Sequence, residues 1–337
     1  MTPLLVNFGG PRASNEIFPF LKELLCDQDV VRTQFPRIIH NYLFTRIAKT
    51  RAMAIGRDYD LIGGRSPIFS DTEYLGHALS QKLQTKVLTF HRYLPETHKT
   101  ALKQIEESDA VEIRILPLFP QFTYATSGSI ARFFARHLSP AAQNKLRWIP
   151  SYPDHPLFVL AFQRRIREFL DYQGLKEEDT VLLFSAHGLP EAFIDTGDPY
   201  RRECERSFQA ILKAFPKVLG KLCFQSKFGK GEWVKPYAEE VCKNILSYNQ
   251  GRQNIVFVPL SFTSDHIETL FEVEYQYLPI LRGENLHAYR CPALNREDYW
   301  IETLASLFLD KIIPLKENVE LIYEKRASQT PLQNHSH

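Results

Sequence analysis

One short segment places a proton-accepting side chain directly after a run of apolar residues. Residues 185–190 read SAHGLP, and the apolar stretch that precedes them predicts a buried strand. An imidazole titrates near neutral pH, so His187 can act as a general base or as a metal ligand. Ligands of open α/β sheets bind beyond the carboxyl ends of the strands, which favours a functional role here. The alternative is a histidine satisfied by local hydrogen bonds.

A second segment, residues 264–272 (SDHIETLFE), places two carboxylates on one face of a predicted helix. Glu268 and Glu272 are four residues apart, and such a like-charge pair costs about 0.2–0.5 kcal/mol. Aligned carboxylates beside a histidine suit binding of a dication or relay of protons. The alternative is structural: Asp265 or Ser264 caps the helix, and Glu268 completes a capping box with Asp265.

Two loops have residue types that could hold an anion. Residues 117–129 end a predicted strand with a hydroxyl-rich turn that opens a helix, and such a turn can bind a carboxylate or phosphate on its backbone amides. N-capping of the helix is the alternative. Residues 62–67 (IGGRSP) could act similarly through Arg65. The sequence contains neither a Walker loop nor the GxGxxG fingerprint, which argues against a dinucleotide enzyme.

The elements that must hold these segments are predicted by apolar runs alternating with amphipathic stretches. The run at residues 181–184 (VLLF) is continuously apolar, as a strand buried on both faces requires. Strands are predicted at residues 4–8, 87–91, 111–116, 146–150, 181–185, 221–225, 254–260 and 286–290, with helices including 154–172, 199–214 and 236–248. Repeated strand-then-helix order predicts an α/β protein with two doubly wound lobes, each built on a four-stranded parallel sheet.

Composition excludes several classes of protein. The 337 residues are 44% hydrophobic and 24% charged, with a net charge of +2, which excludes a disordered chain and gives no field that attracts nucleic acid. Apolar runs are far shorter than the roughly 20 residues of a membrane span. Residues 1–6 lack the features of a secretion signal. Five dispersed cysteines indicate reduced thiols, so we expect a cytoplasmic protein.

One stretch departs from the α/β alternation. Residues 35–53 (FPRIIHNYLFTRIAKTRAM) carry apolar side chains at nearly helical spacing, with Arg46, Lys49 and Arg51 among and after them. Spacing alone favours a helix packed on the core. The alternative is an apolar lip over a cleft, able to contact a large flat ligand or a membrane surface.

Together these motifs resemble the ferrochelatase family, whose members insert ferrous iron into a porphyrin to make haem. The specific part of the resemblance is SAHGLP combined with SDHIETL at this separation. The matching segments lie in family order between residue 4 and about residue 310: 5–11 (LVNFGGP), 62–67, 92–93, 116–129, 184–190, 198–200 (DPY), 225–233 (QSKFGKGEW), 258–274 and 294–295.

The resemblance implies two Rossmann-like lobes of the class II chelatase type with a porphyrin cleft between them. It also implies that His187 is the active-site histidine and Glu268 its partner across the porphyrin face, with Glu272 next in an acidic row. All three are candidate iron ligands, and which of His187 and Glu268 binds iron first stays open. Implied porphyrin-binding residues are Phe8, Tyr59, Ser66, Arg92, Tyr93, Phe122 and Trp233. The lip interpretation of residues 35–53 is then preferred.

The sequence departs from the family pattern at several places. Gln276 stands where the third carboxylate of the acidic row is usual, Arg65 replaces a loop glycine, and Phe122 replaces a common tyrosine. Members with an iron–sulfur cluster use a cysteine after the PQY motif and three near the C-terminus. Tyr124 stands in the first neighbourhood and residues 292–337 contain no cysteine, so we predict no cluster and no prosthetic group, with Fe²⁺ as a substrate.

The predicted activity is insertion of Fe²⁺ into protoporphyrin IX, with lobes at residues 1–152 and 153–314 and a polar tail at 315–337. The partners are then porphyrin and Fe²⁺ without nucleic acid, and membrane contact through the lip stays open. Alternatives are a coproporphyrin ferrochelatase, a chelatase for cobalt or nickel, a non-catalytic haem or porphyrin carrier, and a periplasmic-type binding protein. The apolar lip favours the two-propionate porphyrin. A carrier needs an axial ligand but no base, so the joint presence of His187 and Glu268 argues against one.

Overall fold

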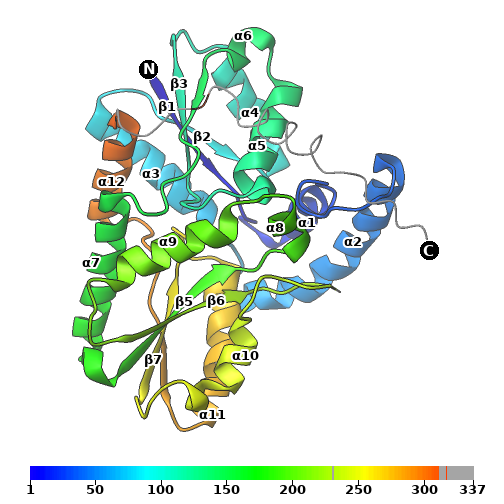
Figure 1. The fold of residues 1–337 in the computed structure, drawn as a ribbon. Helices are drawn as coiled ribbons and strands as arrows, with labels where there is room; N and C mark the ends of the chain where they lie inside the picture. The colour runs from blue at the N-terminus through cyan, green and yellow to red at the C-terminus, as the bar shows by residue number, and fades with distance from the viewer. Residues whose placement is uncertain (230, 311–315, 317–337) are drawn as a thin grey trace.

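The computed structural model describes residues 1–229, 231–310 and 316. The predicted polar tail therefore lies outside the described residues, apart from Lys316, which pairs with Trp148 at the edge of the first sheet. Two sheets lie one above the other in Figure 1, with helices on their faces and α2 (Arg37–Leu61) projecting to one side.

Each sheet has four parallel strands, and the two sheets have the same topology. The first has the order β2-β1-β3-β4, and the second has the order β6-β5-β7-β8. The strands are β1 (Thr2–Asn7), β2 (Leu88–His91), β3 (Ile113–Pro117), β4 (Leu146–Trp148), β5 (Thr180–His187), β6 (Leu219–Gln225), β7 (Asn254–Pro259) and β8 (His287–Arg290). All eight predicted strands are confirmed, as are the two doubly wound lobes.

Helices connect successive strands and cover both sheets. The α-helices, besides α2, are α1 (Ile17–Leu25), α3 (Ile68–Leu83), α4 (Pro95–Glu106), α5 (Ser129–His137), α6 (Pro140–Gln143), α7 (Pro156–Gln173), α8 (Glu191–Asp195), α9 (Tyr200–Leu212), α10 (Ala238–Lys243), α11 (Leu278–Gly283) and α12 (Asp298–Leu309). Short 3₁₀-helices are η1 (Ser14–Glu16), η3 (Glu177–Asp179) and η4 (Ile245–Ser247), and π-helices are η2 (Tyr124–Gly128) and η5 (Glu268–Tyr277).

The central strand β5 shows why the sequence folds this way. Its first seven residues are all buried, because β6 and β7 flank it on both edges and helices cover both faces. The predicted helix at residues 154–172 is confirmed as α7, which ends where Gly174 adopts a left-handed conformation (φ 65°). The predicted helix at 236–248 is too long. It breaks at Asn244, whose backbone (φ −107°, ψ 19°) leaves the helical region.

The lobes share a hydrophobic core. One buried cluster joins Leu5 and Leu116 of the first sheet to Leu182 of the second and to Trp300 of α12. The last helix, α12, packs against α3 and α7 and so returns the chain to the first lobe, as Figure 1 shows. This shared core holds the carboxyl ends of the two sheets in a fixed relation to each other.

Candidate active site

The two segments singled out from the sequence meet at one edge of the second sheet. β5 ends at His187, and β7 ends at Pro259, before the loop that leads to η5. β5 and β7 are neighbours at the point where the strand order reverses, which is where open α/β sheets bind ligands.

His187 is held with one ring nitrogen free. Its Nδ1 lies within hydrogen-bond distance of the carbonyl oxygen of Gly188, and its backbone N–H donates to Ser261 Oγ at 3.0 Å. A carbonyl only accepts, so Nδ1 carries the hydrogen and Nε2 of the neutral ring has the lone pair. Nε2 lies 3.6 Å from Glu268 Oε1, and the side chain is 40% exposed. His187 therefore presents a base to solvent at the carboxyl edge of the second sheet.

Glu268 lies between two imidazoles. Its Oε1 is 3.6 Å from His187 Nε2, and its Oε2 is 3.7 Å from His266 Nε2. Ser226 Oγ donates to Oε2 at 3.2 Å. Burial alone would raise the pKa of Glu268, but the attraction of His187 in its protonated form and the interactions with His266 outweigh it and lower the pKa to about 2. The carboxylate is therefore ionised at neutral pH.

Glu272 has the opposite electrostatic environment. Burial first, and then the negative charge of Glu268, raise the pKa of Glu272 to about 7. Ser226 Oγ and Gln225 Nε2 donate to its Oε2 at 2.7 and 3.2 Å and only partly offset these effects. Near neutral pH one carboxyl of the pair is ionised and the other exchanges a proton, which suits a site that must accept protons.

The helix that bears this pair differs from the predicted one. η5 is a π-helix whose N-cap, Ile267, makes no side-chain cap. The capping box that was the structural alternative for Glu268 is therefore not formed. The carboxylate of Asp265 instead accepts from Thr269 Oγ1, Arg290 Nη1 and Asn295 Nδ2, each at 2.8 Å. Glu268 is thus not needed to begin the helix, and its carboxylate is available to the histidines. π-Helical segments are frequent at functional sites.

Aromatic side chains from both lobes approach the pair. Tyr59, near the end of α2, is buried, and burial together with the charge of Glu268 raises its pKa. Phe8 follows β1 and packs edge-to-face on Tyr93 with ring centroids 4.5 Å apart. Trp233 lies against Gly188, where an added Cβ would come within 3.1 Å of the indole ring. Tyr59 thus lies near Glu268 and Trp233 lies beside the residue that follows His187, whereas Phe8 and Tyr93 belong to an aromatic group within the first lobe.

Two of the predicted porphyrin-binding residues are engaged within the first lobe. Arg92 and Tyr93 are buried, and Asp27 Oδ2 accepts from Arg92 Nη2 at 2.8 Å and from the Tyr93 hydroxyl at 3.0 Å. Ser129 Oγ donates to the same oxygen. The guanidinium of Arg92 is therefore neutralised by the chain itself, and its role in this structure is to hold Tyr93 in place.

The hydroxyl-rich turn at residues 117–129 binds carboxylates of its own chain. The N–H of Phe122 donates to Glu203 Oε2 at 2.7 Å, and the N–H of Tyr124 donates to Asp198 Oδ2 at 2.9 Å. Thr123 Oγ1 donates to Asp198 Oδ2 at 2.7 Å. It also accepts from the backbone N–H of Ala125 and so caps the helix η2. These two amides are thus used by internal carboxylates rather than by an external anion, and the capping alternative is confirmed.

The remaining predicted residues lie at the first-lobe side of the cleft. Ser66 is buried and packs so closely on Gly10 that a Cβ there would come within 2.5 Å of its hydroxyl. Phe122 is buried and packs edge-to-face on Tyr124. The acidic row ends as the sequence indicated, because Gln276 is exposed and no carboxylate follows Glu272 at that spacing.

Sequence reasoning missed four residues that shape the site. Gln225 and Ser226 donate to the carboxylate pair, Ser261 accepts from the backbone of His187, and Arg51 lies across Phe228 with its guanidinium carbon 4.1 Å from the ring centroid. In the sequence, Gln225 and Ser226 stand out only as part of the motif QSKFGKGEW, and Arg51 stands out only as a basic residue of the predicted lip. The roles of these residues depend on contacts between distant segments, which residue spacing does not show.

The described part of the chain has no group of three or more His, Cys, Asp and Glu residues arranged to hold a metal ion. The available donors are His187 Nε2 and the carboxylates of Glu268 and Glu272. Within that same part, no helix combines the length and the apolar character needed to cross a membrane. All five cysteines are free thiols.

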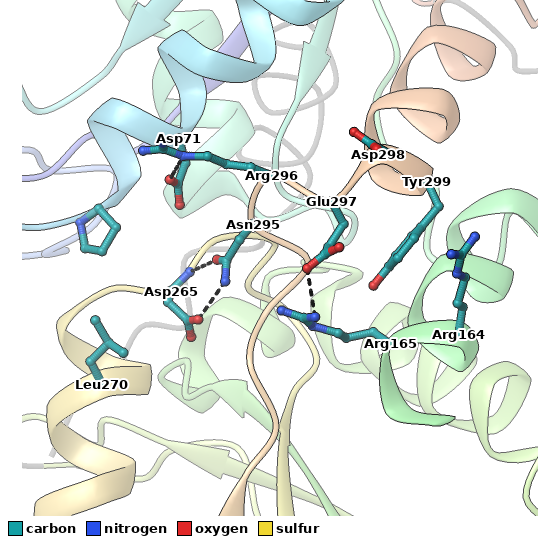
Figure 2. Close-up of a pocket in the computed structure, with 11 residues that line it drawn as sticks. Asp71, Arg164, Arg165, Asp265, Leu270, Asn295, Arg296, Glu297, Asp298 and Tyr299 are labelled. Atoms are coloured by element: carbon teal, nitrogen blue, oxygen red, sulfur yellow. Dashed lines mark hydrogen bonds and ion pairs between the residues drawn. The ribbon is translucent and has the colours of Figure 1, made fainter. Parts of the chain in front are cut away.

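A separate cavity of about 570 Å³ lies beyond the Asp265 loop and does not include His187 or Glu268. Figure 2 shows two charged pairs at this cavity, Asp71 with Arg296 and Glu297 with Arg165. Arg296 pairs with Asp71 at 2.6 Å, and Arg165 pairs with Glu297 at 2.8 Å. The Arg296–Asp71 pair joins the two lobes, and the Arg165–Glu297 pair joins α7 to the segment before α12 within the second lobe. The charged side chains that line this cavity are therefore used in ion pairs of the protein itself. We place the chemistry at His187, Glu268 and Glu272 instead.

These features define a two-lobed α/β protein with a His–Glu pair at the switch point of its second sheet, faced by aromatic side chains of the first lobe. A solved structure with a similar fold is CbiX, described as the terminal enzyme for biosynthesis of sirohaem in denitrifying bacteria. It matches with a TM-score of 0.52 and 14% identity over 93% of this chain and all of that one, so the likeness concerns the fold alone.

Sequence comparison identifies the family. The profile described as Ferrochelatase matches residues 3–312. The ferrochelatase of Chlamydia trachomatis serovar L2 is 45% identical over 307 residues, which is 91% of this chain and 95% of that protein. The ferrochelatase of Chlamydia pneumoniae is 41% identical over 322 residues, covering 96% and 94%. The chain belongs to the ferrochelatase family, as the motifs predicted.

Proposed function

We propose that this protein is a lyase that inserts Fe²⁺ into protoporphyrin IX, forming protohaem and releasing two protons, the last step of haem biosynthesis. The observation that carries the proposal is His187 Nε2 facing Glu268 at 3.6 Å beside aromatic surfaces, in a member of the ferrochelatase family. A carrier would need an axial ligand, but it would not need a half-buried carboxylate pair with divergent pKa values.

Proton removal is assigned to His187. A porphyrin must lose two pyrrole N–H protons before a metal can bind all four nitrogens. The Nδ1–H of His187 is engaged by the carbonyl of Gly188, so Nε2 accepts the first proton. The imidazolium then lies against ionised Glu268, which stabilises its positive charge. Glu272, with a pKa near neutrality, is suited to take the proton onward.

Iron delivery is assigned to the same pair of elements. Fe²⁺ accepts imidazole and carboxylate ligands. His187 and Glu268 can each bind the ion, and Glu272 is a further candidate from the next turn of η5. The two roles of His187 exclude each other in time, because an imidazole that holds a proton on Nε2 cannot bind a metal there.

The porphyrin is assigned to the aromatic surfaces of the cleft. Phe8 is half-buried and offers an aromatic surface that can pack on a large planar ring. Tyr93 is fully buried and packs on Phe8, and Tyr59 and Trp233 are 2% and 8% exposed. Packing that bends the ring would tilt a nitrogen lone pair toward the metal and lower the barrier to insertion. The complete proposed pocket is Phe8, Tyr59, Ser66, Arg92, Tyr93, Phe122 and Trp233, with Arg92 acting through its contacts to Asp27.

Arg51 of α2 is a candidate partner for a propionate of the porphyrin. Burial lowers the pKa of its guanidinium. Such a cation gains from pairing with a carboxylate. Its contact with Phe228 lies between α2 and the loop after β6, which places it at the border of both lobes.

The N-terminal half of α2 supports contact with a lipid surface. Ile38 is 84% exposed, and Phe35, Ile39 and Tyr42 are also exposed, while Arg46 follows on the same helix. Apolar side chains beside basic ones are typical of helices that lie in a membrane interface. We expect the full chain to sediment with anionic vesicles and the Ile38→Glu/Tyr42→Glu variant to remain in the supernatant. Equal sedimentation of both would contradict this contact.

The protein needs no prosthetic group in this proposal, and Fe²⁺ is consumed as substrate. No iron–sulfur cluster is expected, because residues 292–337 contain no cysteine and the thiols of Cys204, Cys223 and Cys291 are buried with raised pKa values. We also propose a cytoplasmic location. We propose the boundary between the two lobes at residues 152/153.

One experiment tests the proposed function. The protein is incubated anaerobically with Fe²⁺ and either protoporphyrin IX or coproporphyrin, and the metalloporphyrin spectrum is followed. Fast insertion into protoporphyrin and slow insertion into coproporphyrin is the expected result. The reverse preference would make the protein a coproporphyrin ferrochelatase. Porphyrin binding without insertion of Fe²⁺ would make it a carrier.

A further inference from the structure

Gln225, the last residue of β6, contacts both halves of the His–Glu site. In the register of the sheet it lies beside His187. Its backbone carbonyl accepts from the N–H of Gly188 at 2.7 Å, and its side-chain Oε1 accepts from the hydroxyl of Ser185. The segment that bears His187 is therefore bonded to Gln225 on both sides of the histidine.

The other end of the same side chain holds the carboxylate helix. Gln225 Nε2 donates to the backbone carbonyl of Glu268 at 2.9 Å and to Glu272 Oε2 at 3.2 Å. These acceptors belong to the first turn and a half of η5. The carboxamide of Gln225 thus links β5 to η5, because its oxygen accepts from β5 and its nitrogen donates to η5.

Gln225 has no access to a ligand. It is 1% exposed, so it lies behind the histidine and the carboxylates rather than in the cleft. Both ends of its carboxamide are hydrogen-bonded, which fixes the orientation of the group. The backbones of Gly188 and Gln225 also pack closely, since a Cβ added at Gly188 would be 2.7 Å from the carbonyl oxygen of Gln225.

We propose that Gln225 is a positioning residue that sets the separation between His187 Nε2 and Glu268. It acts on the reaction through these two residues and does not contact either substrate. The inference rests on the proposed insertion activity. A displacement of reacting groups by about 1 Å can reduce a rate on the order of 100-fold, so loss of this link is expected to reduce turnover and leave porphyrin binding intact.

The test compares Gln225→Met with Tyr248→Phe. Methionine keeps the length of the side chain and removes both hydrogen-bonding ends. The Tyr248 hydroxyl donates to the carbonyl of Gly220 at the other end of β6, so its removal also takes a hydrogen bond from this strand but lies far from the site. The measurements are kcat and KM for metal insertion, porphyrin affinity by fluorescence quenching, and Tm.

We expect Gln225→Met to lower kcat by a factor on the order of 10 to 100, with porphyrin affinity and KM within about twofold of wild type. Tyr248→Phe should lower Tm similarly and keep kcat. A folded Gln225→Met with kcat within twofold of wild type overturns the inference, as does an equal loss of kcat in Tyr248→Phe.

If Gln225→Met does not fold, Ser185→Ala provides the same test on a smaller scale, because it removes only the hydroxyl that fixes the carboxamide. It should lower kcat severalfold without changing KM, and unchanged kcat would overturn the inference. Wild-type protein run in parallel separates the two proposals. Absence of insertion by wild type contradicts the proposed function, whereas active wild type and active variants contradict only the role of Gln225.

Discussion

Replacement of Glu268 by glutamine separates chemistry from structure at this site. The carboxylate makes no helix cap, and glutamine retains an oxygen that can accept from Ser226 Oγ. The change removes the negative charge that faces His187 Nε2 at 3.6 Å and His266 Nε2 at 3.7 Å. The protein should therefore still fold, with a lower Tm than wild type, because the interactions that lower the pKa of the carboxylate also stabilise the folded state.

The effect on turnover follows from the charge that is lost. Two unit charges about 4 Å apart interact by about 4 kcal/mol at an effective dielectric constant near 20. Solvent screens part of this attraction because His187 is 40% exposed, which leaves about 3 kcal/mol for the imidazolium formed during proton removal. That amount corresponds to a factor on the order of 100 in kcat. Loss of Glu268 as an iron ligand would add to it.

The assay measures kcat for Fe²⁺ insertion, porphyrin occupancy by fluorescence, and Tm for wild type and Glu268→Gln. We expect a folded variant with a moderately lowered Tm, bound porphyrin and turnover reduced on the order of 100-fold or more. A variant that binds porphyrin and keeps more than about a tenth of wild-type turnover would refute the electrostatic role of Glu268. A large fall in Tm would show instead that Glu268 has a structural role.

Three further results are expected. Glu272→Gln should lower turnover less than Glu268→Gln, because no carboxylate continues the row beyond Gln276; a larger loss would reverse the two roles. The raised pKa of Glu272 makes the folded state hold a proton that the unfolded state releases, so wild-type stability should fall as pH rises from about 4.5 to 7, and Glu272→Gln should flatten this fall in Tm. Gly188→Ala should lower both Tm and kcat, because its Cβ would lie 2.7 Å from the Gln225 carbonyl, whereas Gly283→Ala, with nothing within 4 Å, should change neither.

The arrangement of strands was predictable because it depends on local apolar pattern. Buried parallel strands such as β5 require continuous apolar runs, and the repeated strand–helix order permits few topologies. His187 and Glu268 could be placed at the same edge for that reason. The motifs of the ferrochelatase family then named them, and the structure brings them to 3.6 Å.

The parts that could not be predicted depend on contacts between distant segments. The link through Gln225 joins residues more than 40 positions apart, and nothing in the spacing of polar residues specifies it. The π-helical form of η5 differs from an α-helix by one residue per hydrogen-bonded turn, which an apolar pattern does not resolve. Asp265 has the spacing of a cap, yet Arg290 and Asn295 from the next strand and loop compete successfully for its carboxylate.

The central claim is that His187 removes the pyrrole protons of a porphyrin already bound in the cleft. The most direct test is a single-turnover experiment in which protoporphyrin is first bound to His187→Ala under anaerobic conditions and Fe²⁺ is then added. Loss of the imidazole leaves the aromatic surfaces unchanged, so we expect full porphyrin occupancy and no formation of the haem spectrum on the timescale of wild type. Haem formation at a near-normal rate in the fully occupied variant would contradict the assignment of His187 as the base.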